Sequence, residues 1–493
     1  MNPFIKINPA DDVAVALVPI SKGTTVLIGN QRITLNDDVP TGHKFLLTDK
    51  KKGDDVIKYG YSIGKLREDH HIGDCIDHRH IQTNLSGLLD YSYCPVNTEL
   101  PSATTLRHFS GYRRSNGDVG IRNELWIIPT VGCVNGICLE LKEALQSRLG
   151  KRFPVHAFTH NYGCSQLGDD HDNTRKILRD MALHPNAGGV LIVGLGCENN
   201  QPESFEATLG DYDKRRIRFF VAQKVEDEIT TGMSLLMEIV EEMRHDVRVD
   251  IPLGELRVGL KCGGSDGLSG ITANPLLGMF SDFIVAQGGT TVLTEVPEMF
   301  GAETILMNRC ANEELFHQTV ELINGFKQYY ISHGEPVGEN PSPGNKAGGI
   351  STLEEKALGC TQKSGMSAVR GVLAYGERLS EKGLNLLSAP GNDLVASTAL
   401  AAAGCHLVLF TTGRGTPFGT FVPTLKVSTN NDLAKRKSTW IDFNAGTLAE
   451  GEDKDTTLER FVEKVIEIAN GEMTWNEKKH YQEIAIFKTG VTL

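Results

Sequence analysis

Several common functional signals are missing from this chain of 493 residues. No run approaches the roughly 18 apolar residues that a membrane helix needs, and the first residues lack the basic leader and apolar core of a signal peptide. The net charge is −12 without any block of lysine or arginine, which argues against nucleic acid or an anionic membrane surface as a partner. We therefore expect a cytoplasmic protein that acts on a small molecule.

Nucleotide and disulfide motifs are absent as well. Asn199 stands where a G-x-G-x-x-G dinucleotide loop needs its third glycine, and Gly413-Arg-Gly lacks the Lys-Ser/Thr ending of a P-loop. The ten cysteines contain no C-x-x-C pair and no zinc-ribbon spacing. These absences favour neither NAD nor ATP as a cofactor, and they predict no disulfide framework.

The pattern of apolar residues changes along the chain. Short β-like runs fill residues 5–89, a stretch rich in Pro, Ser and Thr follows, and strands alternate with helices from Gly111 onward. Such alternation predicts parallel sheets. We expect a multidomain α/β protein with an all-β domain over 1–92, a linker over 93–110, and α/β regions over 111–250 and 251–493. The apolar run 283–286 is one of the expected strands.

Residues 262–278 concentrate the most chemistry. Cys262, Ser265 and Asp266 place a thiol, a hydroxyl and a carboxylate on a backbone that holds five glycines. The segment follows a short strand-like run, so we expect it at the carboxyl end of a strand, where open α/β sheets bind their ligands.

Five further polar, glycine-rich loops stand out. They are residues 41–44, 159–164, 194–198, 340–349 and 411–419. Lys346 and Arg414 add a positive charge to the last two, whose backbone amides could hold a carboxylate or a phosphate.

Histidines and carboxylates allow two interpretations. His43 and His160 lie in glycine-rich loops and are either structural or catalytic. His78 and His80 alternate along an expected strand, where one face could clamp a metal or an acid, or simply be solvated. A carboxylate pair at a strand end could bind a cation, act as acid and base, or cap a helix start. It consists of Glu295 and Glu298.

Cysteines beside glycines leave three alternatives open. They could be metal ligands, catalytic thiols or small apolar fillers. They are Cys133, Cys164, Cys197 and Cys262.

The loops, in this order, resemble those of the altronate and galactarate dehydratases along the whole chain. The matching motifs include Pro40-Thr-Gly-His-Lys44, residues 160–164, 194–198, 262–278 and 340–349, Glu355-Lys-Ala-Leu-Gly359, and residues 411–419. Gly359-Cys-Thr-Gln-Lys363 and the ending 485–493 resemble the altronate branch. One departure stands out, because that branch carries His-x-His-Asn where this chain has Asp77-His78-Arg79-His80.

This resemblance implies an N-terminal β-clip (SAF-like) domain, a flexible linker, a second domain used for dimerisation, and a C-terminal Rossmann-like domain of unusual topology with a metal site. It also implies a requirement for Fe²⁺ or another divalent metal such as Mn²⁺. The implied reaction converts D-altronate to 2-dehydro-3-deoxy-D-gluconate and water, in hexuronate catabolism.

The chemistry of dehydration suggests roles for these residues. A divalent cation held by Cys262 and Asp266, with Glu295 or Glu298, would stabilise the charge that forms when the C2 proton leaves. We expect His160 to take that proton and His43 to protonate the departing 3-hydroxyl, with Cys164 as a further catalytic candidate. Expected substrate contacts are Ser265, Asn274, Asn345, Lys346, Arg414 and Thr416.

Four alternatives remain at this point. An iron–sulfur cluster on three of Cys133, Cys164, Cys197 and Cys262 could replace the lone cation. The substrate could be galactarate or another aldonate, the reaction could be that of a sulfolactate lyase, or the protein could bind a sugar acid without turnover.

Overall fold

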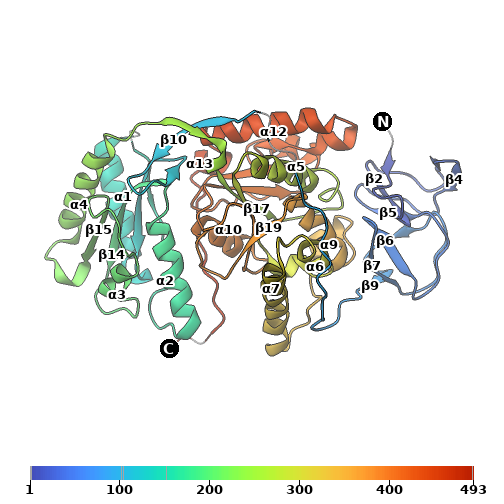
Figure 1. Cartoon of the computed structure of the whole chain (residues 1–493), viewed down its shortest axis with the longest axis horizontal. Helices are drawn as coiled ribbons and strands as arrows, with labels where there is room; N and C mark the ends of the chain where they lie inside the picture. Colours follow the sequence, from blue (N-terminus) through green and yellow to red (C-terminus); the bar gives the residue numbers. More distant parts are fainter. Residues whose placement is uncertain (1–2, 101–102, 104, 151–152, 491, 493) are drawn as a thin grey trace.

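The computed structural model describes residues 3–100, 103, 105–150, 153–490 and 492. Three regions lie in a row, and the C-terminal region stands between the other two (Figure 1). Among the described residues, no helix has the length and apolar character that a membrane crossing requires.

The N-terminal region consists of antiparallel strands, as its alternating apolar residues predict. Its sheets have the orders β1-β2-β5-β8 and β6-β7-β9, and β3 and β4 form a separate hairpin. The strands are β1 (Phe4–Ile5), β2 (Val13–Ala16), β3 (Thr25–Ile28), β4 (Gln31–Thr34), β5 (Lys44–Leu46), β6 (Asp55–Lys58), β7 (Tyr61–Leu66), β8 (Cys75–Ile76) and β9 (Ile81–Gln82). One of its apolar cores includes Ala302, Ala357 and Leu358 of the C-terminal region, so the two regions are packed together.

The second region is built on a parallel sheet of order β13-β12-β14-β15. Helices α1 and α4 share one apolar core with it, and α2 shares another that extends into the C-terminal region. The elements are β12 (Glu124–Pro129), α1 (Asn135–Leu149), β13 (Val155–Ala157), α2 (Gly168–Ala182), β14 (Ala187–Gly194), α3 (Pro202–Ala207), β15 (Ile217–Val221) and α4 (Glu228–Met243). A small antiparallel sheet beside it contains β11 (Val119–Gly120), β10 (His108–Arg113) and β16 (Val249–Pro252).

The C-terminal region contains a seven-stranded, all-parallel sheet of order β19-β20-β18-β17-β21-β22-β23. In chain order this is 3-4-2-1-5-6-7, which differs from the 3-2-1-4-5-6 order of Rossmann sheets. The strands are β17 (Arg257–Cys262), β18 (Thr290–Leu293), β19 (Val369–Leu373), β20 (Gly383–Leu387), β21 (Leu407–Thr412), β22 (Thr424–Ser428) and β23 (Phe443–Asn444). The helices are α5 (Ala273–Ala286), α6 (Glu303–Met307), α7 (Glu313–Ser332), α8 (Pro343–Ala347), α9 (Leu353–Thr361), α10 (Asp393–Ala402), α11 (Asn431–Arg436), α12 (Lys454–Ala469) and α13 (Trp475–Lys478).

One expected strand is wrong. Residues 283–286 form the last turn of α5, because the buried side chains Leu276, Phe280 and Ile284 recur every four residues along that helix. The short window hid a helical period that only the longer segment reveals.

The connection between the first two regions lies along the C-terminal region. Its described residues between Gln82 and His108 contain no helix or strand. The Tyr93 hydroxyl donates to the Cys310 carbonyl at 2.6 Å, and the Val96 amide donates to the Asn308 carbonyl at 2.9 Å. The expected linker is therefore held in place by hydrogen bonds.

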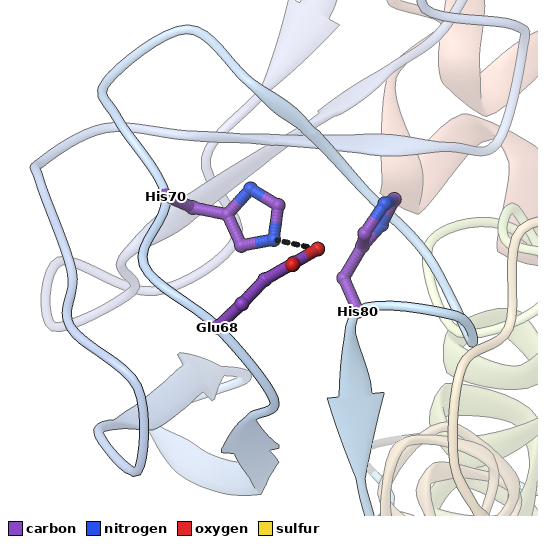
Figure 2. Close-up of side chains that lie close together, drawn as sticks. All are labelled: Glu68, His70 and His80. Carbon is purple, nitrogen blue, oxygen red and sulfur yellow. Dashed lines mark ion pairs between the residues drawn. The ribbon is translucent and has the colours of Figure 1, made fainter.

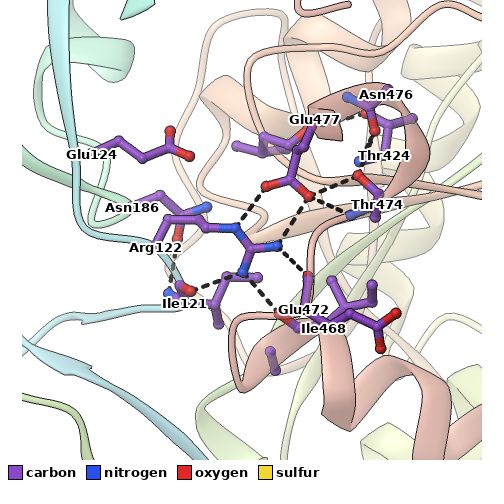
Figure 3. Close-up of polar contacts among 12 residues, drawn as sticks. Ile121, Arg122, Glu124, Asn186, Thr424, Ile468, Glu472, Thr474, Asn476 and Glu477 are labelled. Atoms are coloured by element: carbon purple, nitrogen blue, oxygen red, sulfur yellow. Dashed lines mark hydrogen bonds and ion pairs between the residues drawn. The ribbon is translucent and has the colours of Figure 1, made fainter. Parts of the chain in front are cut away.

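A buried arginine ties the second region to the C-terminal region (Figure 3). The Arg122 guanidinium donates to both carboxylate oxygens of Glu477, at 2.7 and 3.0 Å, and to the carbonyls of Ile468 and Glu472 at 2.8 Å. Bidentate pairs of this kind fix the orientation of both partners.

Candidate active site

Four of the six glycine-rich loops meet where the N-terminal and C-terminal regions touch. They are residues 41–44, 262–278, 340–349 and 411–419. Gly267 N donates to Gly348 O at 2.7 Å, and Arg414 N donates to Gly264 O at 3.0 Å. A methyl group added to Gly267 would lie 1.9 Å from the Gly42 carbonyl oxygen, so no side chain fits there. The other two loops follow β13 and β14 of the second region.

Beneath this junction lies a buried group of two thiols and a carboxylate. Cys262, the last residue of β17, is 1% exposed. Its Sγ lies 3.0 Å from Glu298 Oε2 and 3.4 Å from Cys360 Sγ. The ligand atoms of all three residues lie within 4.8 Å of one another, and their types are those that Fe²⁺ and Zn²⁺ accept.

Two lysines already contact this group, Lys356 on α9 and Lys363 just after it. Lys363 Nζ lies 2.8 Å from Cys262 Sγ, and Lys356 Nζ lies 2.6 Å from Glu298 Oε1. Both lysines are buried, so their charges act through a medium that screens poorly. A divalent cation would have to enter beside two ammonium groups that already neutralise its ligands. A cation held by this group would therefore compete with both lysines for Cys262 and Glu298.

A third lysine completes the cluster. Lys261 Nζ contacts Glu295 and lies 2.8 Å from Asp393 Oδ1. Glu295, just after β18, has the left-handed backbone angles φ 66° and ψ 62°. Such strain in a residue other than glycine is found most often at functional sites, and here it directs the carboxylate beneath the loop junction.

The environment separates the protonation states of these groups. The hydrogen bond with Cys360, helped by Lys363 and opposed by burial, lowers the pKa of Cys262 to about 6. Burial, reinforced by Glu298, raises the pKa of Glu295 well above its ordinary value. Burial alone would also raise the pKa of Glu298, but Lys356 and Lys363 hold it well below its usual range. These shifts favour the thiolate of Cys262, the protonated form of Glu295 and the carboxylate of Glu298.

A narrow crevice leads from the loop junction toward this cluster. Its volume is about 10 Å³, room for roughly one water molecule. Lys58 and Tyr59 line it on the N-terminal side, and Ser265, Lys356 and Cys360 line it on the C-terminal side. The buried Ser265 hydroxyl has no hydrogen-bond partner, so it is free to bind a polar ligand.

Ion pairs hold the N-terminal region over this crevice. Lys44 Nζ lies 2.8 Å from one carboxylate oxygen of Glu355 and Lys58 Nζ lies 2.7 Å from the other, with all three side chains at most 1% exposed. Burial alone would raise the pKa of Glu355, but the two lysines lower it to about 2.

Three predicted ligands near the crevice are engaged by protein groups. Asp266 accepts hydrogen bonds from Thr429 and Asn430, among others. Asn274 Nδ2 donates to the Gly359 carbonyl at 3.0 Å, and Asn345 Nδ2 donates to the Ser265 carbonyl at 2.8 Å. These contacts hold the loops together, and the predicted roles in binding metal or substrate stay predictions.

The predicted anion-binding residues lie toward solvent. Arg414 is exposed and lines a separate open cleft of about 700 Å³ beside Asp266. Lys346 is half-buried on α8, and the Thr416 hydroxyl accepts from the Phe418 amide at 3.3 Å.

The two predicted catalytic histidines are not brought together. His43 is partly buried at the loop junction, with Nδ1 3.4 Å from the Thr41 carbonyl. His160 belongs to the second region, where Nε2 lies 2.8 Å from the Pro129 carbonyl and Nδ1 accepts from the Tyr162 amide at 3.1 Å. Burial lowers the pKa of His160 to about 4.

The cysteines of the cluster hypothesis separate into two places. Cys133, Cys164 and Cys197 are exposed and follow β12, β13 and β14, which are neighbours in the sheet of the second region. Cys262 is buried in the C-terminal region. Cys262 Sγ instead has Cys360 Sγ as its neighbour. The sequence did not indicate this contact.

The expected strand through His78 and His80 is wrong. β8 ends at Ile76 and a turn spans residues 78–80, because the Asp77 carboxylate accepts from the Arg79 amide at 2.8 Å. Asp side chains favour turns by this kind of bond. The two histidines consequently do not share a strand face.

Sequence reasoning missed the lysines and Cys360. Lys356, Cys360 and Lys363 recur at intervals of four and three residues, which places them on one side of a helical segment. Lys261 interrupts an apolar strand. Charged residues inside otherwise buried elements were the available signal.

Buried acid–base groups at the carboxyl edge of a parallel sheet are an arrangement that can transfer protons, as in many enzymes. Three family models match successive parts of the chain: the altronate/galactarate dehydratase SAF domain over 2–84, the D-galactarate dehydratase/altronate hydrolase second domain over 111–244, and the D-galactarate/altronate dehydratase C-terminal model over 253–492.

Full-length relatives agree with these matches. The chain is 57% identical to an altronate dehydratase of Bacillus subtilis, with all of both chains covered, and 56% identical to one of Escherichia coli, with 99% of this chain and all of the relative covered. A galactarate dehydratase (L-threo-forming) of Escherichia coli is 33% identical over 91% of this chain and 89% of its own. The chain belongs to the galactarate/altronate dehydratase family.

Proposed function

We propose that this hydro-lyase dehydrates D-altronate to 2-dehydro-3-deoxy-D-gluconate. The main support is the full-length sequence identity of 56–57% to two altronate dehydratases, compared with 33% to a galactarate dehydratase. The buried cluster supplies the acid and base that a dehydration needs.

The crevice offers a place for the substrate carboxylate. Lys58 and Lys356 line it from opposite sides, and ammonium groups bind carboxylates strongly where water is excluded. The Ser265 hydroxyl, which has no partner, would form a hydrogen bond with a substrate hydroxyl, either as donor or as acceptor.

Proton transfer follows from the protonation states. The Cys262 thiolate is the base best matched to neutral pH, and it takes the C2 proton. The C3–O bond then breaks as the protonated Glu295 gives its proton to the leaving hydroxyl, forming water. Lys261 and Lys363 stabilise the negative charge that develops on the substrate carboxylate. The resulting enol becomes the 2-keto product by tautomerisation.

Entry of the substrate requires the N-terminal region to move. A crevice of about 10 Å³ cannot hold a sugar acid, and Cys360 separates it from Cys262. The ion pairs of Glu355 with Lys44 and Lys58 would break and re-form in each cycle. Closure would then exclude water from the reaction.

Turnover decides between substrates. We expect 2-keto-3-deoxy acid from D-altronate, and much less from galactarate or other aldonates, in an assay under reducing conditions with Fe²⁺ or Mn²⁺. Faster turnover of galactarate would contradict the substrate assignment. Binding without turnover of any of these acids would favour a non-catalytic sugar-acid binding protein.

A sulfolactate lyase is the weaker alternative. The beta subunit of a (2R)-sulfolactate sulfo-lyase from Chromohalobacter salexigens is 29% identical over 77% of this chain. Release of sulfite from sulfolactate, measured beside the altronate assay, would support this alternative.

For the metal that the family resemblance implies, we propose the exposed thiols of Cys133, Cys164 and Cys197. The loops that carry them are joined, because Asn200 N donates to Gly163 O at 3.0 Å and Gly132 N donates to Tyr162 O at 3.0 Å. Thiolates are the usual ligands of iron–sulfur clusters, so the three thiols would hold a cluster with one open iron, away from the edge where the proton transfers are proposed.

Spectroscopy separates the two sulfur groups. Anaerobically purified protein should show visible absorbance and acid-labile sulfide, which Cys164→Ser should lose and Cys262→Ser should keep. A colourless, sulfide-free protein that a divalent metal activates would contradict the cluster.

We also propose a homodimer formed through the second region. Light scattering on the purified chain should give twice the chain mass of 53.9 kDa, and a monomer would contradict it.

A further inference from the structure

Outside the candidate active site, three side chains of the N-terminal region point toward one another (Figure 2). Glu68 and His70 follow β7, and His80 precedes β9. The ligand atoms of these residues lie within 4.8 Å of one another. The two imidazole rings meet edge to face, with centroids 4.8 Å apart.

His70 is prepared to bind a ligand. Asp74 Oδ2 lies 3.2 Å from His70 Nδ1, which holds the proton on that nitrogen and leaves a lone pair on Nε2. Nε2 is shielded from solvent, has no hydrogen-bond partner and lies 3.7 Å from Glu68 Oε1. A shielded nitrogen without a partner is costly, and a bound cation would satisfy it.

His80 has a carboxylate of its own. His80 Nδ1 accepts from the Asp77 amide at 3.2 Å and lies 3.2 Å from Asp77 Oδ1, while Arg79 holds the same carboxylate at 2.7 Å. These contacts hold the ring in one orientation before any ion binds.

The backbone around these residues is fixed without any ion. The His70 amide donates to the Lys50 carbonyl, and the His70 carbonyl accepts from the Lys50 amide, both at 2.9 Å. The His80 carbonyl accepts from the Arg67 amide at 2.9 Å. Two histidines are therefore held in place before binding, and only the exposed Glu68 has to order.

We propose that Glu68, His70 and His80 bind one divalent transition-metal ion, with water in the remaining positions. Imidazole and carboxylate ligands in this number suit ions such as Zn²⁺, Co²⁺ and Fe²⁺. The ion would join the segment after β7 to the turn before β9. This site is separate from the proposed function, because its donors are nitrogen and oxygen and it lies outside the crevice.

Cobalt titration of the chelator-treated, full-length protein tests this proposal. We expect His70→Ala and His80→Ala each to lose one bound Co²⁺ and its visible d–d absorption. His71→Ala should keep the bound Co²⁺ and its absorption, because His71 is an exposed neighbour whose Nδ1 lies 3.5 Å from Asp49 Oδ1. Circular dichroism checks folding, and His80→Gln provides a milder variant.

The supporting carboxylate gives a second readout. Asp74→Asn should weaken Co²⁺ binding about 10- to 100-fold while keeping the stoichiometry, since it weakens the contact that orients the His70 ring. Equal stoichiometry and affinity in the wild type and both alanine variants would overturn the proposal. So would a thiolate-to-cobalt band that disappears in Cys262→Ser but persists in His70→Ala.

Discussion

Two parallel sheets in this protein end in glycine-rich loops, but their carboxyl edges hold different groups. At the edge of the second region the cysteines are exposed, and both ring nitrogens of His160 are used by the main chain. At the edge of the C-terminal region Lys261, Cys262 and Glu295 are buried and in contact. The difference arises from what covers each edge. Helix α9, the residues just after it and the N-terminal region cover the edge of the C-terminal region. They bring the lysines that allow charges to be buried there.

Removing a lysine from the buried edge should have the largest effect. Lys261→Met removes the ammonium group that contacts Glu295 and Asp393, and with it charge stabilisation during the reaction. We expect turnover of D-altronate to fall about 10²- to 10³-fold. Steady-state kinetics on protein shown to be folded would measure it.

Lys382→Met provides the matched control, because Lys382 is an exposed lysine paired with Glu255. Its turnover should equal that of the wild type. A Lys261→Met enzyme with full activity would show that the buried edge is merely structural.

Loss of the carboxylate beneath the N-terminal region should destabilise its packing. Glu355→Gln leaves Lys44 and Lys58 buried without their shared anion, which costs about 3–5 kcal/mol. Because the folded pKa of Glu355 is lowered to about 2, its stabilisation is present above about pH 4.5 and is lost as the pH falls toward 2. Urea unfolding at pH 7 and pH 3 should therefore show a difference between variant and wild type that shrinks in acid. A constant difference would contradict this origin.

The substitution His160→Gln, at the sheet edge of the second region, should have a smaller effect. Both ring nitrogens of His160 bond to the main chain, so we expect a loss of about 1–3 kcal/mol in stability and little change in turnover. Thermal unfolding and kinetics on the same preparation would check this. Strong loss of turnover in a stable variant would restore His160 as the predicted base and would make the second edge catalytic.

Local features were more predictable than the contacts between distant segments. The short β-like runs expected over residues 5–89 are strands such as β3 (Thr25–Ile28), and the strand–loop pattern indicated the parallel sheets, because both follow from local periodicity. The strand expected at 283–286 failed because its period was visible only over the whole of α5.

Only part of the candidate site could be predicted from the sequence, because several of its contacts depend on tertiary packing. Cys262, Glu295 and Glu298 stand out in the sequence, but Cys360 and Lys363 reach Cys262 through the packing of α9. A buried lysine is stable only beside its partner, and that partner is set by tertiary structure rather than by spacing. The group of Glu68, His70 and His80 likewise depends on the pairing of His70 with Lys50 and on a turn where a strand was expected.

The pH dependence of kcat/KM for D-altronate tests the central claim, that the Cys262 thiolate is the base, most directly. Because the pKa of Cys262 is about 6, kcat/KM should fall about tenfold for each pH unit below 6 as the thiolate becomes protonated. Cys262→Ser should lose most of the activity and this acidic limb with it. A wild-type profile that stays flat from pH 7 to pH 5, or the same limb in Cys262→Ser, would contradict the account.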